Sequence, residues 1–186
     1  MLRLTVFIVV SALAAYVSRA SLGSWRTHGF YRFFGWECII GLILLNFRGA
    51  AQWFHDPLSA RQLASWLLLI LSLLPLGLGV HWLRRLGHAD AQVRRDPRLL
   101  RIEQTTRLVT TGVYRYIRHP IYASLLLLTW GVFFKSPSWV ALGLAAGASL
   151  LLLATAVTEE RENAQYWGAS YDAYRRDTKR FIPFLF

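Results

Sequence analysis

Five long apolar blocks limit what this chain can fold into. A helix needs about 20 residues to cross a hydrocarbon core of roughly 30 Å. Of the 186 residues, 55% are hydrophobic and 17% are charged, and the apolar residues form blocks rather than a helical or strand period. We therefore predict an all-α integral membrane protein with about five transmembrane helices. The blocks are residues 4–16 (extendable to 1–19), 33–47, 63–83, 121–134 and 139–157.

The five blocks differ in how well they suit a membrane. The third and fifth are long and carry no charged residue, whereas the second contains Glu37, which is costly in lipid unless it is protonated, paired or turned into the bundle. The fourth, residues 121–134, is short, and we expect it to form a hairpin with the fifth through residues 135–138. A signal peptide is the alternative for the first block, but no clear small-residue cleavage site follows it.

Basic residues predict the orientation. Residues 84–118 contain nine Arg, and residues 19–32 contain three, whereas the connections around Arg48 and Lys135 are poor in positive charge. Because cytoplasmic loops are enriched in Lys and Arg, we predict a multi-pass protein with a cytoplasmic C-terminus and an external N-terminus. The net charge of +11 thus reports membrane topology. It does not indicate a nucleic-acid partner, because the charges flank apolar spans instead of forming a groove-binding motif.

The chain divides into two unequal parts. Residues 1–86 are predicted to be N-terminal transmembrane helices with little chemistry in them, and residues 87–186 to be the catalytic part, with a helical hairpin and an amphipathic tail. In that tail, one polar and three aromatic residues recur at helical spacing and share what we call the aromatic face. Gly168 weakens or divides the helix. The apolar ending that follows is either an anchor at the membrane surface or a lid over a site there. The face comprises Asn163, Trp167, Tyr171 and Tyr174.

The run of residues 108–122 has the features of a turn that enters a helix. Gly112 permits a tight turn, Pro120 suits the first helical position, and His119 before it is pushed towards an extended conformation. The start of such a helix presents amide groups and a partial positive charge, which favour a carboxylate or a phosphate. Arg118 and His119 would add donors there. The alternative is that Arg118 extends to the membrane surface and the tyrosines form an interfacial belt.

The pair Glu159 and Glu160 is predicted to lie at the cytoplasmic end of the fifth helix. If the fourth and fifth helices form a hairpin, this pair lies near Arg118 and His119. Acids at a helix C-terminus oppose the helix dipole, so they need another role, either salt bridges to arginine or binding of a cation. Amides, cations, acids and tyrosines together would suit a zwitterion such as S-adenosylmethionine, although other ligands also fit.

These elements resemble the isoprenylcysteine carboxyl methyltransferase and phospholipid methyltransferase superfamily over residues 103–183. The resemblance is carried by the Arg-His-Pro-x-Tyr element, the Glu pair and the Gly-x-x-Tyr-x-x-Tyr tail. It implies a buried cofactor site for S-adenosyl-L-methionine on the cytoplasmic side, reached by an amphiphilic substrate from the lipid bilayer. The residues implied in cofactor binding are Thr106, Arg107, Leu108, Val109, Tyr114, His119, Pro120, Ile121, Tyr122, Glu159 and Glu160.

The resemblance also implies a role for each of these residues. Main-chain groups of 107–109 would line the adenosine and Tyr114 would pack against the cofactor. Residues 119–122 would surround its amino-acid end, and Glu159 would hold its ammonium group, with Glu160 as a second acid.

Two positions depart from the family's pattern. Thr106 stands where the family usually has His, and Thr155 stands where the isoprenylcysteine enzymes place an Arg with a substrate and catalytic role. No catalytic residue is therefore assigned. The acceptor is left as an amphiphilic, lipidated or lipid-like molecule, of which a carboxylate, as in isoprenylcysteine methylation, is one kind.

Two other functions remain as alternatives. One is a membrane sterol or steroid reductase that uses NADPH, and the other is a membrane scaffold that keeps the fold without activity. The His and Asp residues do not have the spacing of a metal site, so no metal is expected.

Overall fold

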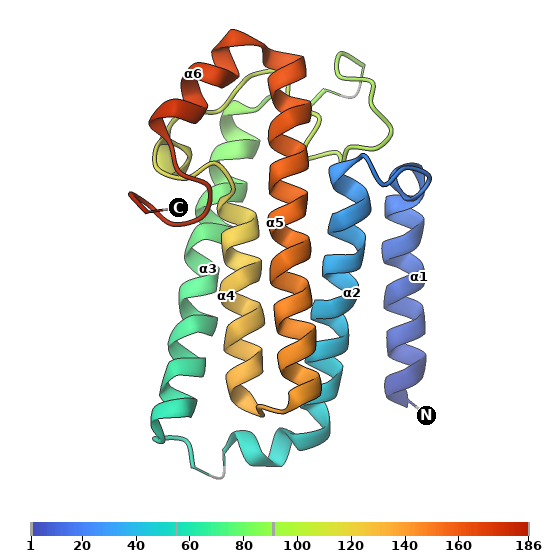
Figure 1. The fold of residues 1–186 in the computed structure, drawn as a ribbon, viewed down its shortest axis with the longest axis vertical. Coiled ribbons are helices and arrows are strands. Elements are labelled where there is room, and N and C mark those ends of the chain that lie inside the picture. Colours follow the sequence, from blue (N-terminus) through green and yellow to red (C-terminus); the bar gives the residue numbers. More distant parts are fainter. Residues whose placement is uncertain (1, 55, 91, 186) are drawn as a thin grey trace.

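A computed structural model of the chain describes residues 2–54, 56–90 and 92–185. In these residues the regular structure is helical, which confirms the all-α prediction (Figure 1). Five long helices coincide with the five apolar blocks, and a short helix follows them. The elements are α1 (Leu2–Leu22), α2 (His28–Asn46), η1 (Phe47–Trp53), α3 (Ala60–Leu86), η2 (Gly112–Arg115), α4 (Pro120–Lys135), α5 (Trp139–Trp167) and α6 (Ala169–Asp177).

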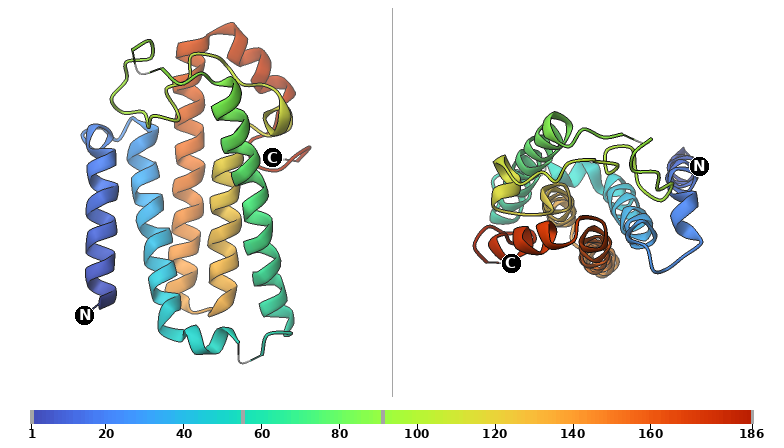
Figure 2. Two further views of the ribbon diagram at one scale, coloured as in Figure 1. Left: turned by 180° about the vertical axis from the view of Figure 1, so that it is seen from behind. Right: turned by 90° about the horizontal axis from the view of Figure 1, so that it is seen from above.

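The five long helices run alternately up and down. Helix α3 packs along α4, α4 along α5, and α5 along α2, while α1 lies at the edge of the bundle against α2 (Figure 2). The predicted hairpin between α4 and α5 is confirmed, and the Ser138 hydroxyl caps α5 by accepting a hydrogen bond of 3.1 Å from the Ala141 amide. Gly168 separates α5 from α6 with a positive φ of 58°, so the predicted break at this residue is confirmed as well.

Small residues on α5 allow the helices to approach closely. One face of α5 is fully buried and carries mostly alanine, and it meets α2 at Ile39 and Leu42. Small side chains at a helix interface let the backbones come together, which is how helices commonly pack in membranes. The buried residues of this face are Ala141, Ala145, Ala148, Leu152 and Ala156.

The outside of the bundle is apolar. On α3, Leu63, Leu67, Ile70 and Leu74 follow one helix face and each is more than half exposed. A continuous leucine face on the surface is what lipid contact requires and what a protein in water avoids. By length and composition, three of the described helices can cross a membrane: Arg3–Leu22, Ala60–Leu86 and Trp139–Trp167; α4 is apolar but shorter.

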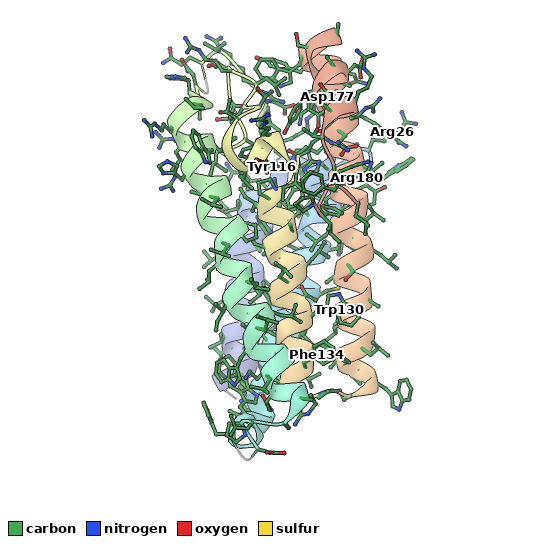
Figure 3. All side chains as sticks on the ribbon, turned by 90° about the vertical axis from the view of Figure 1, so that its left-hand side faces the viewer. Arg26, Tyr116, Trp130, Phe134, Asp177 and Arg180 are labelled. Atoms are coloured by element: carbon green, nitrogen blue, oxygen red, sulfur yellow. The ribbon has the colours of Figure 1, made fainter. Side chains whose placement is uncertain are left out.

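Charge is concentrated at one end of the bundle. There α1, α3 and α5 end, α2 and α4 begin, and the connector (residues 87–111), η2, α6 and the C-terminal tail (residues 178–185) gather, so this is the basic end (Figures 1 and 3). Of the 21 Lys and Arg residues, only four belong to the opposite end: Arg3, Arg48, Arg61 and Lys135. The bundle therefore has strong charge asymmetry, and the residues expected to carry chemistry lie at its basic end.

Candidate functional site

A cavity lies at the basic end, lined by α2, the end of α3, the connector, η2, α4, α5 and α6. It collects eight of the eleven residues that the sequence predicted for a cofactor site. These are Leu108, Val109, Tyr114, His119, Pro120, Ile121, Tyr122 and Glu159. The aromatic face of the tail also lines it, through Asn163, Trp167, Tyr171 and Tyr174. The structure thus brings together segments that are more than 60 residues apart in the chain.

The turn into α4 has the predicted tight turn at Gly112 and proline at the start of the helix, whereas His119 is not in the extended conformation that was expected. Gly112 has a φ of 62°, and a Cβ there would lie 2.2 Å from the Trp82 ring, so the turn has no room for a side chain. Pro120 occupies the first turn of α4, and His119 precedes it with φ −123° and ψ 62°. The His119 side chain does not cap the helix. The amides of the first turn and the positive end of the helix dipole therefore border the cavity.

The two glutamates have different surroundings. Glu159 lines the cavity, where its Oε2 accepts a hydrogen bond of 2.6 Å from the Tyr122 hydroxyl and lies 3.8 Å from Nδ1 of His119. Its Oε1 has no partner within the described part of the chain. Of the pair, Glu159 is therefore the glutamate whose carboxylate can meet a cation bound in the cavity.

Glu160 does not line the cavity and is 3% exposed. Its Oε1 is 2.9 Å from Arg118 Nε, 3.2 Å from His119 Nε2 and 3.0 Å from Arg180 Nε, and its Oε2 is 2.9 Å from Arg180 Nη2. One carboxylate thus joins α5, the loop before α4 and the C-terminal tail. The predicted salt bridge to Arg118 is present. The expectation that the pair ends the fifth helix was wrong, because α5 continues to Trp167, about two turns beyond Glu160.

The C-terminal tail is fastened to the loop that enters α4, whose residues Arg118 and His119 line the cavity. The amides of Arg118 and His119 donate to the carbonyls of Lys179 and Arg180, at 2.8 and 3.1 Å, and the Lys179 amide donates to Tyr116 O at 3.1 Å. The Tyr174 hydroxyl donates to Tyr114 O at 2.7 Å. Burial raises the pKa of the Tyr174 hydroxyl, so it remains a neutral donor. Beyond these bonds, the apolar residues Ile182, Phe184 and Leu185 are exposed.

Three of the sequence-predicted residues do not line the cavity. Besides Glu160, these are Thr106 and Arg107, whose amides donate to Gly87 O at 3.0 and 3.2 Å. The Thr106 hydroxyl donates to His88 O at 2.8 Å, and the Arg107 side chain is exposed. These residues hold the connector against the end of α3. Thr155 is fully buried and its hydroxyl donates to Leu151 O at 2.7 Å, outside the cavity lining.

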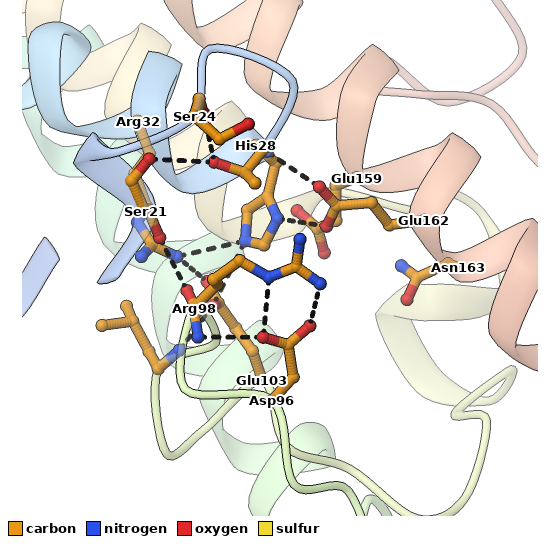
Figure 4. A network of polar contacts seen from close by, with 12 residues as sticks. Ser21, Ser24, His28, Arg32, Asp96, Arg98, Glu103, Glu159, Glu162 and Asn163 are labelled. Carbon is orange, nitrogen blue, oxygen red and sulfur yellow. Dashed lines mark hydrogen bonds and ion pairs between the residues drawn. The ribbon is translucent and has the colours of Figure 1, made fainter. Parts of the chain in front are cut away.

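An ionic network beside the cavity was missed by the sequence reasoning (Figure 4). His28 at the start of α2 lies 2.6 Å from Glu162 Oε2 through Nδ1 and 3.3 Å from Glu103 Oε2 through Nε2. Arg32, one turn later, pairs with Glu103. Glu103 thereby fastens the connector to α2. Charged residues next to an apolar block were the available signal, but their partners are about 70 or more residues away in the chain.

This network sets the charge of its acids. Burial alone would raise the pKa of Glu103, but the Arg32 charge and the His28 hydrogen bond outweigh it and hold the pKa at about 2. Arg32 is 1% exposed, lines the cavity, and keeps its Nε and Nη2 without a hydrogen-bond partner among the described residues. Buried donors are nearly always paired, so these two N–H groups are candidates for a ligand.

The composition of the cavity wall limits what it can bind. Glu159 offers a negative charge, the start of α4 offers amides and a partial positive charge, and Leu108, Val109 and Tyr114 offer apolar and aromatic surface. This donor set suits an amphipathic zwitterion with a flat ring. Among the described residues, no group of three or more His, Cys, Asp or Glu is placed to hold a metal ion.

Comparison with known families agrees with this location. Residues 95–169 match the phospholipid methyltransferase family. The match confirms the resemblance found in the sequence, and with the apolar helices it supports a membrane methyltransferase in broad terms. It spans most of the connector, η2, α4 and α5, so it contains every residue predicted for the cofactor site. Comparisons with curated proteins and with solved structures gave no match.

Proposed function

We propose that this chain is an S-adenosylmethionine-dependent methyltransferase that acts on an amphiphilic acceptor at the cytoplasmic surface of a membrane. The single observation that carries the proposal is the position of Glu159. Its carboxylate faces a cavity that also contains the start of α4, and both lie within the segment that matches the methyltransferase family.

The cavity residues have complementary roles in holding the cofactor. Glu159 binds the ammonium group of the cofactor, and the first-turn amides of Ile121 and Tyr122 face the carboxylate of the cofactor's amino-acid part. Leu108, Val109 and Tyr114 pack around the adenosine. Tyr122 orients Glu159 by donating to its Oε2. Thr106 and Arg107 act through the main chain, since they hold the connector in place.

The protein's contribution to the reaction is orientation and exclusion of water. S-adenosylmethionine, when bound, supplies a methyl group that is activated towards a nucleophile. The connector and α6 line the cavity, and the Glu160 contacts tie the C-terminal tail to α5. A dry site with fixed partners favours a transfer in which positive charge is lost.

The membrane arrangement follows from the charge asymmetry. We propose that all five long helices cross the bilayer, with the shorter α4 enclosed between α3 and α5. The basic end is cytoplasmic, since positive residues favour that side. The C-terminus is then cytoplasmic and the N-terminus external. The acceptor enters from the bilayer, where the apolar face of the bundle borders the cavity.

Arg32 favours an acceptor that carries an anionic group. In the isoprenylcysteine enzymes an Arg is expected where this chain has Thr155, but Thr155 is buried outside the cavity lining. Arg118 is bound to Glu160, so it is committed elsewhere. Arg32, in contrast, reaches the cavity from α2 with two unused N–H groups. A carboxylate acceptor would satisfy them, because guanidinium groups bind carboxylates with two parallel hydrogen bonds.

Ligand-dependent thermal stability in detergent tests the cofactor. S-adenosylhomocysteine is expected to raise the melting temperature of the purified chain, since a ligand that binds only the folded state stabilises it. NADPH is expected to leave it unchanged. Stabilisation by NADPH alone would favour the reductase, and stabilisation by neither would favour the scaffold. Incubation with labelled S-adenosylmethionine and a lipid extract, followed by mass spectrometry, then identifies the acceptor.

A further inference from the structure

A second cleft opens at the basic end, where the α1–α2 loop, the connector and α5 meet. It contains none of the eight predicted residues that line the cavity. Its walls include Arg26, Tyr31, Arg161 and Tyr166. Three residues line both the cleft and the cavity and lie between them: Arg94, Leu99 and Glu162. The cleft is therefore a neighbour of the proposed cofactor site but not a part of it.

The charges in this cleft do not balance. Its acids are occupied: Asp96 receives two hydrogen bonds from the Arg98 guanidinium, at 2.9 and 2.7 Å, and Glu162 is bonded to His28. The guanidinium groups of Arg26 and Arg161, in contrast, have no hydrogen bond or ion pair within the described residues, although Arg26 lies 5.4 Å from the Trp25 ring centroid. Two unused cations thus face one cleft from two different elements.

The cleft lies at the depth of the lipid headgroups. From Trp139 to Arg161, α5 is about 33 Å long, and α2 is about 28 Å long, compared with a hydrocarbon core of roughly 30 Å. With α2 and α5 crossing the membrane, Arg26 and Arg161 stand just beyond the core, on the same side, because α2 begins and α5 ends at the basic end (Figure 1). Trp25 and Tyr166 are exposed beside them, as aromatic residues are in the interfacial belt.

We infer that this cleft binds the phosphate of an anionic phospholipid headgroup between Arg26 and Arg161. Arginine binds phosphate with parallel hydrogen bonds, and an interfacial position makes a lipid the source of that phosphate. The acyl chains then lie along the apolar surface of α2 and α5, and Trp25 and Tyr166 flank the headgroup. This binding goes beyond methyl transfer and rests only on the membrane arrangement proposed above.

Lipid binding to the full chain in a neutral detergent tests the site. Native mass spectrometry would measure the dissociation constants of phosphatidylglycerol and of phosphatidylcholine. The cleft variant is Arg26→Gln with Arg161→Gln. The matched control is Arg84→Gln with Arg85→Gln, since these exposed residues lie at the same end of the bundle on α3 and the charge change is equal. Melting temperatures recorded in parallel show whether each variant folds. If the double cleft variant does not fold, Arg26→Gln and Arg161→Gln are measured singly.

The wild type is expected to prefer phosphatidylglycerol, and the cleft variant to bind it roughly tenfold more weakly, because it loses the hydrogen bonds of both guanidinium groups to the phosphate. The control should change by about twofold or less. Arg26→Lys with Arg161→Lys, which keeps both charges, should retain the preference. Equal losses in cleft and control variants would overturn the site in favour of general surface charge. Equally tight binding of inorganic phosphate or glycerol phosphate would overturn the lipid as its occupant.

Discussion

The two ends of the bundle each bury a cationic side chain, but at only one end do the described residues fill the contacts of its charged group. At the end opposite the basic end, called the outer end after the membrane arrangement proposed above, Lys135 is 2% exposed. Its Nζ lies 3.1 Å from Gln62 Oε1 and 3.2 Å from the Trp66 ring centroid. At the basic end Arg32 is 1% exposed, and its Nη1 pairs with Glu103 while Nε and Nη2 remain without a partner in the described chain. Similar burial therefore serves different purposes.

This difference separates a structural contact from a functional one. The Lys135 contacts join α3 to the end of α4, and Arg61 adds hydrogen bonds to the carbonyls of Phe134 and Lys135 at 2.9 and 2.6 Å. They close the outer end. At the basic end, unused groups on Arg32 and Glu159 border a cavity. Because leaving a buried donor unpaired costs about 1–3 kcal/mol, such groups indicate where a ligand is expected to bind.

The largest expected effect is a loss of stability on breaking the ion pairs of Glu160, which are the structural contacts of the basic end. Glu160→Gln removes the charge shared by Arg118, His119 and Arg180. Breaking a buried ion pair from one side typically costs roughly 3 kcal/mol of unfolding free energy. The melting temperature in detergent should fall markedly, whereas Asp172→Asn, in the exposed pair with Arg175, should change it little. A stable Glu160→Gln protein would show that the tail does not depend on this carboxylate.

Glu159→Gln is expected to affect the ligand and not the fold. The carboxylate is partly exposed to the cavity, and losing its charge should weaken S-adenosylhomocysteine binding by roughly 30- to 100-fold, since one partner of a charged contact is removed. The melting temperature without ligand should stay close to the wild type. Isothermal titration calorimetry measures the first quantity and thermal unfolding the second. Unchanged affinity would remove Glu159 from the cofactor site.

The sequence predicted the features that depend on neighbouring residues and missed the contacts between residues far apart in the chain. The apolar blocks, the turn at Gly112, the hairpin through residues 135–138 and the break at Gly168 each depend on neighbouring residues, and the structure confirms them. The different surroundings of Glu159 and Glu160 could not be predicted, because Arg180 and Tyr122 reach them through the tertiary fold. The contacts of Arg32 with Glu103 were missed for the same reason.

At the outer end, Gln62→Leu should reduce the stability of the fold without changing the affinity for the cofactor product. The substitution keeps the side chain's size but leaves Lys135 Nζ without its acceptor, for a loss of about 1–2 kcal/mol. Thermal unfolding should report this loss, while the dissociation constant of S-adenosylhomocysteine stays unchanged. A weakened affinity would mean that the outer end is coupled to the cavity, and the comparison of the two ends would fail.

Arg32→Lys tests the unused donors directly. Lysine keeps a positive charge beside Glu103 but removes the planar guanidinium with its two unpaired N–H groups. For an anionic acceptor, the KM should rise about tenfold, with little change in S-adenosylhomocysteine affinity. Steady-state kinetics with the identified acceptor separates these quantities. Equal KM values for the two proteins would assign Arg32 to holding the connector only.

The smallest expected effect is a pH dependence specific to the basic end. The Glu103 pKa is about 2 in the folded chain, below its ordinary value of 4.5. Its ion pairs therefore stabilise the fold fully above about pH 5, and this contribution declines as the pH falls through 4.5 towards 2, by roughly 1 kcal/mol at pH 4. In Glu103→Gln this part of the pH dependence of thermal unfolding should be absent, whereas Gln62→Leu should retain it. If both variants kept the same acid dependence, another group would be responsible, and the connector would not depend on the charge of Glu103.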